Sequence, residues 1–202
     1  MNNFDSKMYW ETRYIKNKNS GPGSYGRLAK FKAEIINNFV TKHNIQNIIE
    51  FGCGDGNQLS YYKFKNYTGI DVSKTALDIC KEKFENDSSK KFIELDNYNG
   101  QKADLSMSID VIFHLVEDEI FHIYMQNLFY SSNRYVIIYS SNNANLNSKG
   151  AKHVKHRCFT DWIRTNKANW NMLDKIENKY TTSLPNTTNK SFSDFFIFEK
   201  IQ

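Results

Sequence analysis

Short apolar runs bounded by turn residues recur along the chain, and segments with an apolar residue at every third or fourth position separate them. Such runs are typical of strands buried on both faces, whereas the longer period indicates amphipathic helices. Their alternation predicts an α/β chain with a mostly parallel sheet. We expect strands over residues 47–51, 67–71, 91–95, 103–109, 135–140, 172–180 and 194–200.

The clearest helical pattern lies between residues 26 and 41. Leu28, Phe31, Ile35 and Phe39 recur there at helical spacing, with Lys32 off the apolar face, so this helix is expected to pack on the sheet. Further helices are predicted over residues 5–15, from residue 57, from an N-cap at residue 73 to residue 84, over residues 117–130 and over residues 160–167.

The order of these elements predicts a doubly wound, seven-stranded sheet whose last two strands form an antiparallel hairpin. With 202 residues, 40% of them hydrophobic, the chain suits a single domain with a sizeable core. Residues 1–45 would form an N-terminal helical lid and the first packing helix, and residues 46–202 the α/β core. Tyr9, Trp10, Arg13 and Tyr14 are the lid candidates.

Three alternating glycines follow the first expected strand, in the segment EFGCGDG that begins at Glu50. Because Gly52, Gly54 and Gly56 lack Cβ atoms, the backbone N–H groups of this loop are expected to approach a ligand closely. Glu50, and Asp71 at the end of the next strand, would point into the crevice at the carboxyl edge of the sheet. Asp71 is placed to accept the hydroxyl groups of a ribose.

The position of Glu50 helps to identify the nucleotide. A dinucleotide-binding loop settles a pyrophosphate on a helix N-terminus with no anionic group nearby. Glu50 would repel a pyrophosphate, but it suits a ligand that carries an ammonium group. The order E-x-G-x-G-x-G therefore favours S-adenosylmethionine over NAD.

These residues resemble the class I S-adenosylmethionine-dependent methyltransferases, as do Asp71-Val72-Ser73 and the segment from Ala103 to Leu115. The resemblance implies a Rossmann-like fold, methyl transfer and S-adenosylmethionine as the cofactor. In that family a polar group after the third strand usually meets the adenine, although polar residues there are also ordinary loop formers. The resemblance assigns the cofactor to Glu50, Gly52, Gly54, Gly56, Asp71, Val72, Asp96, Asn97, Tyr98 and Ser108.

Asp110 and His114 follow the fourth expected strand, where the methyl group would emerge, and they are the catalytic candidates. A base is needed only when the acceptor carries a proton at neutral pH. His114 could serve as that base, with Asp110 either orienting it or touching the cofactor. The alternative is a histidine that only completes a helix end.

A second group of polar residues, HVKHRC, begins at His153. Lys155 and Arg157 would supply charge for an anion, and arginine offers a bidentate fork for phosphate. A solvated basic loop is the alternative. The histidines with Cys158 make too few ligands at unsuitable spacing for zinc, so no metal is expected.

Three segments are similar to small methyltransferases of bacterial capsule and surface-polysaccharide gene clusters, including those assigned to methyl phosphoramidate decoration. The segments are YWETRY from Tyr9, GSYGRLAKFKAE from Gly23 and SFSDFF from Ser191. The similarity implies a phosphoramidate or sugar-phosphate acceptor, whose ionised phosphoryl oxygen needs no base. It places the acceptor near Arg13, Tyr25, Arg27, His153, His156 and Arg157.

Charge and composition argue against other classes of function and partner. The net charge of +5 is scattered without a Lys/Arg block, and the proline-rich loop of DNA amino-methyltransferases is missing, so no nucleic-acid partner is expected. The apolar runs are too short to span a membrane and the N-terminus carries no apolar signal segment, which predicts a cytoplasmic protein with reduced cysteines. A binding-only accessory protein and a nicotinamide oxidoreductase are the alternative functions.

Overall fold

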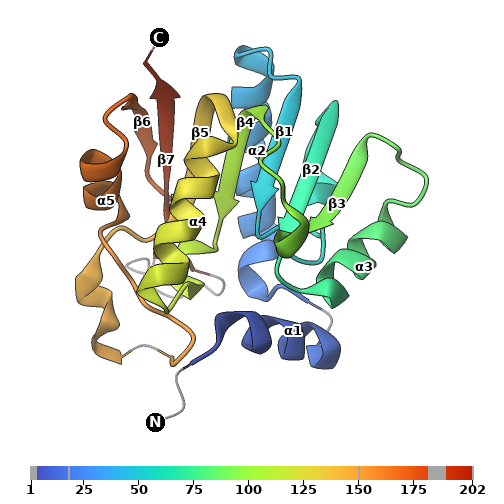
Figure 1. Cartoon of the computed structure of the whole chain (residues 1–202), viewed down its shortest axis with the longest axis horizontal. Coiled ribbons are helices and arrows are strands. Elements are labelled where there is room, and N and C mark those ends of the chain that lie inside the picture. Colours follow the sequence, from blue (N-terminus) through green and yellow to red (C-terminus); the bar gives the residue numbers. More distant parts are fainter. Residues whose placement is uncertain (1–3, 18, 150, 182–189, 202) are drawn as a thin grey trace.

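The computed structural model describes residues 4–17, 19–149, 151–181 and 190–201, and these form a seven-stranded sheet in the order β3-β2-β1-β4-β5-β7-β6 (Figure 1). Strand β7 runs antiparallel to both neighbours, and the other pairings are parallel, which confirms the predicted fold class. The strands are β1 (Asn47–Phe51), β2 (Asn66–Asp71), β3 (Lys90–Glu94), β4 (Ala103–Ile109), β5 (Ser132–Ser140), β6 (Trp170–Ile176) and β7 (Asp194–Lys200).

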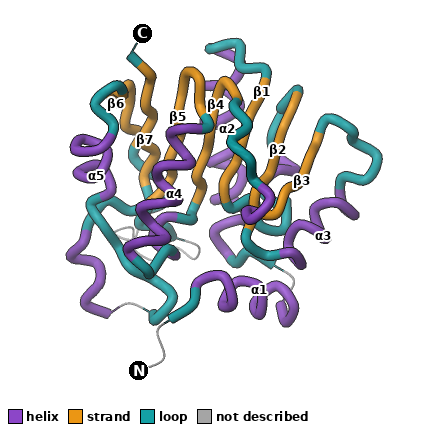
Figure 2. Tube along the Cα trace, viewed as in Figure 1, coloured by secondary structure: helices purple, strands orange, loops and turns teal. Residues whose placement is uncertain are grey.

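Helices cover both faces of the sheet, as Figure 2 shows. Successive residues of a buried strand point to opposite faces, so Ile48 and Ile49 enter different hydrophobic clusters. Helices α2 and α3 contribute to the first cluster, and α4 and α5 to the second. The five α-helices of the described residues are α1 (Ser6–Asn17), α2 (Gly26–Lys42), α3 (Lys74–Lys83), α4 (Asp118–Tyr130) and α5 (Phe159–Asn166).

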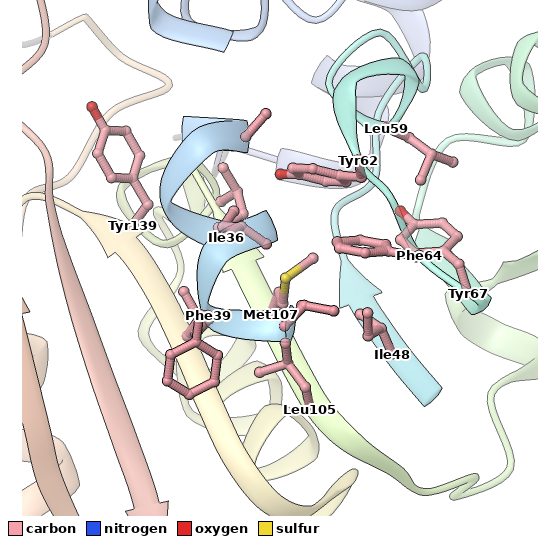
Figure 3. Packing of buried hydrophobic residues seen from close by; sticks show 14 of the residues in the cluster. Ile36, Phe39, Ile48, Leu59, Tyr62, Phe64, Tyr67, Leu105, Met107 and Tyr139 are labelled. Carbon is pink, nitrogen blue, oxygen red and sulfur yellow. The ribbon is translucent and has the colours of Figure 1, made fainter. Parts of the chain in front are cut away.

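Helix α2 packs on the centre of the sheet. In Figure 3, Ile36 and Phe39 of α2 lie beside Met107 and Leu105 of β4. Leu28, Phe31 and Phe39 of the predicted apolar stripe are buried, but Ile35 is only partly buried and its neighbour Ile36 is fully buried. The buried face is also wider than predicted. Lys32, expected off that face, is also completely buried, because it follows Leu28 and precedes Ile36 by one helical turn each.

Helix α1 lies across the edge of the sheet at which the parallel strands end (Figure 1). It is held at its start and in its middle. Ser6 donates its backbone N–H to Glu117 Oε1 at 2.8 Å, next to α4, and Glu11 accepts the Ser73 hydroxyl at 2.6 Å, next to α3. The helix therefore bridges the two sides of the sheet, as a lid would.

The helix predicted from residue 57 is wrong, since that stretch holds only a 3₁₀ turn, Leu59–Tyr61. Hydrogen bonds with α2 hold this segment in a non-helical conformation. Asn37 donates to Tyr61 O at 2.9 Å and accepts from Lys63 N at 2.9 Å, and Gln58 donates to Ala29 O at 2.9 Å. Elsewhere the predicted elements are present, with ends displaced by a few residues. None of the helices in the described ranges is long and apolar enough to cross a bilayer.

Candidate functional site

A cavity of about 1070 Å³ lies where β1, β2 and β4 end. Its wall is formed by these strand ends, by α1 and the loop after it, by one face of α4, and by short segments around His153 and Phe192. The cavity is thus at the carboxyl edge of the parallel strands, between that edge and α1. Open α/β sheets bind their ligands at this edge.

The glycine loop is saturated with internal hydrogen bonds. Every backbone N–H from residue 52 to residue 57 donates to a protein oxygen, which corrects the expectation that these groups face a ligand. Because all the donors are already used, the loop cannot cradle a phosphate, although its carbonyl groups can still accept. In chain order the acceptors are Ile70 O (twice), Asp71 Oδ2, Ser20 Oγ, Cys53 O and Asp55 Oδ1.

The three glycines adopt left-handed conformations, with φ values of 79° at Gly52, 59° at Gly54 and 68° at Gly56. Their missing side chains make room for protein rather than ligand. A Cβ at Gly52 would collide with Val111. A Cβ at Gly54 would collide with Ser20, which belongs to the loop between α1 and α2, called the lid loop below. Gly52 and Gly54 line the cavity, whereas Gly56 faces α3 and does not.

Glu50 and Asp71 both line the cavity and are both buried. Burial raises the pKa of Glu50 to about 7, although the Tyr67 hydroxyl donates to its Oε2 at 2.6 Å. Burial likewise raises the pKa of Asp71 to about 6, against hydrogen bonds from the backbone N–H groups of Gly54 and Ser73, each at 2.9 Å. Asp71 therefore ties the glycine loop to the start of α3.

The remaining cofactor candidates divide into two groups. Val72 and Asp96 line the cavity, with Asp96 held by Lys7 of α1 at 2.5 Å. Asn97, Tyr98 and Ser108 are not in the lining. The Tyr98 ring packs on Phe51, and its hydroxyl bonds to Ser131. Ser108 accepts the Tyr124 hydroxyl at 2.7 Å and is completely buried.

Asp110 lines the cavity in a left-handed conformation, with φ of 59°. Its Oδ2 lies 2.6 Å from Nζ of the buried Lys32, and its Oδ1 accepts the Ser193 hydroxyl at 3.3 Å. Of the two roles predicted for Asp110, the structure does not support orienting His114, because the carboxylate is directed to α2 and to the segment before β7. Contact with the cofactor stays a prediction.

His114 also lines the cavity. Its Nδ1 donates to the carbonyl of His153 at 3.0 Å, which leaves Nε2 as an acceptor. Burial lowers the pKa of His114 to about 4, assisted by the charges of His153 and Arg13 and opposed by that hydrogen bond and by Asp110. The imidazole is thus neutral at physiological pH. Trp10 contacts it edge-on, with 4.7 Å between the ring centroids.

Arg13 and His153 complete this end of the cavity. Arg13 makes no ion pair with any residue that the structure describes, and its buried Nε finds no hydrogen-bond acceptor there. Its guanidinium lies over Trp10, 5.5 Å from the ring centroid. His153 stacks between Tyr9 and His114, with centroid distances of 4.7 and 5.5 Å.

Four of the predicted acceptor residues lie outside the cavity lining in this structure. Tyr25 donates to Asp55 Oδ2 at 2.6 Å and so fixes the lid loop to the glycine loop. Arg27 lies over the Tyr180 ring, 4.7 Å from its centroid. His156 is buried, 2.6 Å from the Ser141 hydroxyl.

Arg157 holds the start of α4 instead of forming a phosphate fork. Its guanidinium donates to Leu115 O at 2.5 Å, Val116 O at 3.0 Å and Asp118 Oδ1 at 2.8 Å. These acceptors use the planar donor set that phosphate would need. In the part of the chain described, no group of three histidine, cysteine or acidic residues is arranged to hold a metal ion.

Sequence reasoning missed several residues that shape the site. Lys32 carries a signal, since it is one helical turn from Leu28 and from Ile36. Ser20 and Asp55 join the lid loop to the glycine loop by two bonds, Ser20 N to Asp55 Oδ2 at 2.9 Å and Asp55 N to Ser20 Oγ at 3.1 Å. Tyr67 supports Glu50 from the next strand. No local pattern reports these two long-range contacts.

Residues 49–126 match the family described as "Methyltransferase domain". The match spans β1 to α4 and includes the glycine loop, Asp71, Asp110 and His114. A search among curated proteins finds no match. Over this segment the chain is therefore similar to methyltransferase domains.

Solved structures share the fold. The N-methyltransferase NodS from Bradyrhizobium japonicum WM9, in complex with S-adenosylhomocysteine, superposes with a TM-score of 0.75 at 14% identity, covering 98% of this chain and 100% of that one. The magnesium protoporphyrin IX methyltransferase from Synechocystis PCC 6803, also with S-adenosylhomocysteine, gives 0.70 at 12% identity, covering 96% and 97%. The methyltransferase domain of bacterial CtHen1-C gives 0.66 at 18% identity, covering 86% and 98%.

Proposed function

We propose that this chain transfers a methyl group from S-adenosylmethionine to a small anionic acceptor, a phosphoramidate or a sugar phosphate, during synthesis of a bacterial capsule or another surface polysaccharide in the cytoplasm. The glycine loop is the observation that supports S-adenosylmethionine as the methyl donor, which is the donor half of this proposal. Its N–H groups are all internally bonded, while two carboxylates face the cavity beside it. Such a wall suits a ligand with cationic and hydroxyl groups, and it has no donors for the pyrophosphate of NAD.

The donor-binding residues proposed here are the cavity-lining members of the predicted set. Asp71 would accept from the ribose hydroxyls, and Glu50 would face the cationic methionine end of the donor. Val72 and Asp96 continue the same wall at the ends of β2 and β3. Glu50 supports this assignment because it is a buried carboxylate without a contacting cation among the described residues, and a buried charge is stable only when it is paired. Gly52 and Gly54 would contribute their backbone.

The acceptor-binding residues proposed here lie where α1 meets the end of β4. Trp10, His114 and His153 provide ring faces and edges, and Phe192 closes the cavity wall nearby. Arg13 is charged, has a buried nitrogen without an acceptor, and is not neutralised by any described carboxylate. An anion at this position would satisfy Arg13, since a buried donor left unpaired costs about 1–3 kcal/mol. The surface-polysaccharide context rests on the similarity of the segments from Tyr9, Gly23 and Ser191.

S-adenosylmethionine supplies a methyl group that is already activated on a sulfonium, so the protein has only to align the acceptor and exclude water. An ionised phosphoryl oxygen forms the new O–C bond as the C–S bond breaks, and the electron pair of that bond stays on sulfur. No proton moves. Arg13 would hold the acceptor, and the neutral His114 would position it rather than deprotonate it.

The donor half is tested by thermal unfolding with added ligands. S-adenosylhomocysteine at 100 times its Kd should stabilise the protein by about 2.7 kcal/mol through mass action, whereas NAD and NADP should leave the melting temperature unchanged. Stabilisation by NAD alone would exclude the proposed donor.

The acceptor half is tested by transfer of a labelled methyl group to sugar phosphates, phosphoramidates and their neutral counterparts. Only the phosphorylated compounds should be methylated. With an active acceptor, Arg13→Met should raise the acceptor KM roughly 10- to 100-fold, the value of a charge-assisted hydrogen bond of about 1.5–3 kcal/mol. The matched control is Arg164→Met on the exposed side of α5, which should leave KM unchanged. Equal methylation of neutral acceptors would refute the anionic assignment.

A further inference from the structure

Lys32 is a wholly buried cation whose charge is directed at the cavity wall. Its side chain has no exposed surface, and it lies on α2 among apolar neighbours of the core. Nζ lies 2.6 Å from Asp110 Oδ2 and 5.3 Å from the centroid of the Tyr139 ring, and the charge of Lys32 also acts to lower the pKa of the buried Glu50. Because a buried ammonium group is stable only when it is paired, Lys32 requires the side chain of Asp110 beside it.

Asp110 is the other half of this pair, and its side chain is 18% exposed. It therefore joins the buried charge to the cavity. Gly23 of the lid loop packs against the same carboxylate, where an added Cβ would lie 3.2 Å from Oδ2. With Ser193 bonded to Oδ1, four segments meet at this carboxylate: α2, the end of β4, the lid loop and the segment before β7.

We propose that Lys32 is a positioning residue for donor binding, which acts through Asp110. It keeps a negative charge at a fixed place on the cavity wall, where the cationic methionine end of S-adenosylmethionine or S-adenosylhomocysteine is bound. The proposal rests on the donor assignment made above. Because one oxygen of Asp110 is committed to Lys32, this carboxylate is a fixed counter-charge and not a proton acceptor for the reaction.

Three variants test this role: Lys32→Met, Asp110→Asn and the double variant Lys32→Met/Asp110→Asn. Asp110→Asn leaves the buried Lys32 charge unpaired and should melt well below the wild type, whereas Lys32→Met leaves a partly exposed carboxylate unpaired and should melt below the wild type by less. The double variant removes both charges at similar volume, so its melting temperature should return to within a few degrees of the wild type. Asparagine also tolerates the left-handed conformation of residue 110. Lys30→Met, on the exposed side of the same helix, is the matched control.

Calorimetric titration with S-adenosylhomocysteine then separates positioning from packing. The stable double variant should bind at least tenfold more weakly than the wild type, with a matching rise in the KM for S-adenosylmethionine and a kcat within about threefold. Affinity equal to that of the wild type would show that the pair only packs the core, and a double variant that melts below both single variants would show the same. A loss of kcat with unchanged KM would assign Asp110 to the chemical step. Any of these results overturns the proposal, whereas a wild type that does not bind the ligand refutes the donor assignment itself.

Discussion

Replacing Glu50 by glutamine should stabilise the ligand-free protein and weaken the donor site at the same time. Burial lifts the pKa of Glu50 from 4.5 to about 7. A tenfold change in an ionisation constant corresponds to about 1.4 kcal/mol, so the ionised side chain destabilises the folded state by about 3 kcal/mol at pH 8. Glutamine carries no charge to bury, and its carbonyl oxygen can still accept the Tyr67 hydroxyl.

The sign of the effect follows from linkage. A carboxyl group whose pKa is raised by folding contributes most to stability below its unfolded pKa, and this contribution is lost as the pH rises through its folded pKa. The wild type should therefore lose stability between about pH 4.5 and pH 7 relative to Glu50→Gln. For a chain of this length, about 3 kcal/mol corresponds to roughly 6–12 °C in melting temperature.

Thermal unfolding at pH 5 and pH 8, with and without S-adenosylhomocysteine, measures both effects. At pH 8 the empty variant should melt above the empty wild type, and the difference should shrink at pH 5. The ligand should stabilise the wild type more than the variant, because the ammonium group of the ligand pairs with the ionised Glu50. Glu85→Gln, at an exposed position on the chain, controls for the change in net charge. A variant with the same pH dependence as the wild type would refute the reasoning.

Three further outcomes are expected. Asp71→Ala removes the acceptor for two backbone N–H groups, so chemical denaturation should show a loss of unfolding free energy of about 1–3 kcal/mol for each group. Calorimetry should show at least tenfold weaker binding of S-adenosylhomocysteine, and unchanged affinity would move the ribose contact elsewhere. With both substrates saturating, His114 should add no limb to the pH profile of kcat between pH 5.5 and 8, because burial lowers its pKa to about 4, and a limb near pH 6.5 that vanishes in His114→Ala would contradict this. Arg157→Met should lower stability by about 1–3 kcal/mol without changing the acceptor KM, and a raised KM would return Arg157 to the site.

Much of the donor side could be predicted because its signals are local. The apolar run that stops at the glycines fixes where β1 ends, and parallel strands bring the ends of β1, β2 and β4 to one edge. Glu50, Asp71 and Asp110 were therefore expected together, and all three line the cavity. The pattern did not predict how the loop is used. The N–H groups that a sequence reading directs at a ligand are taken by Ser20 and Asp71, which are distant in the chain.

The acceptor side was predicted less well because its charged residues are placed by tertiary contacts. A basic cluster after β5 indicates an anion site only if its side chains are left unpaired. Arg157 instead meets the start of α4, where Asp118 and two carbonyl oxygens bind it. Arg13, on the lid helix, is the predicted cation that keeps an unsatisfied buried nitrogen and lines the cavity. Which arginine faces the cavity depends on the position of α1, and sequence spacing carries no information on that position.

The hydrogen bonds of α1 bear directly on the shape of the cavity. The start of the helix is tied to the start of α4 through Ser6 and Glu117, and Glu11, in the middle of the helix, binds the start of α3 through Ser73 and Thr75. Both attachments involve a buried serine, Ser6 in one and Ser73 in the other. Because Trp10 and Arg13 of the same helix line the cavity, a shift of α1 at either attachment would move the cavity wall that these two residues form. Glu11→Gln should therefore weaken ligand binding without any direct contact to the ligand, and unchanged affinity for S-adenosylhomocysteine in calorimetry would show that the position of α1 does not depend on this bond.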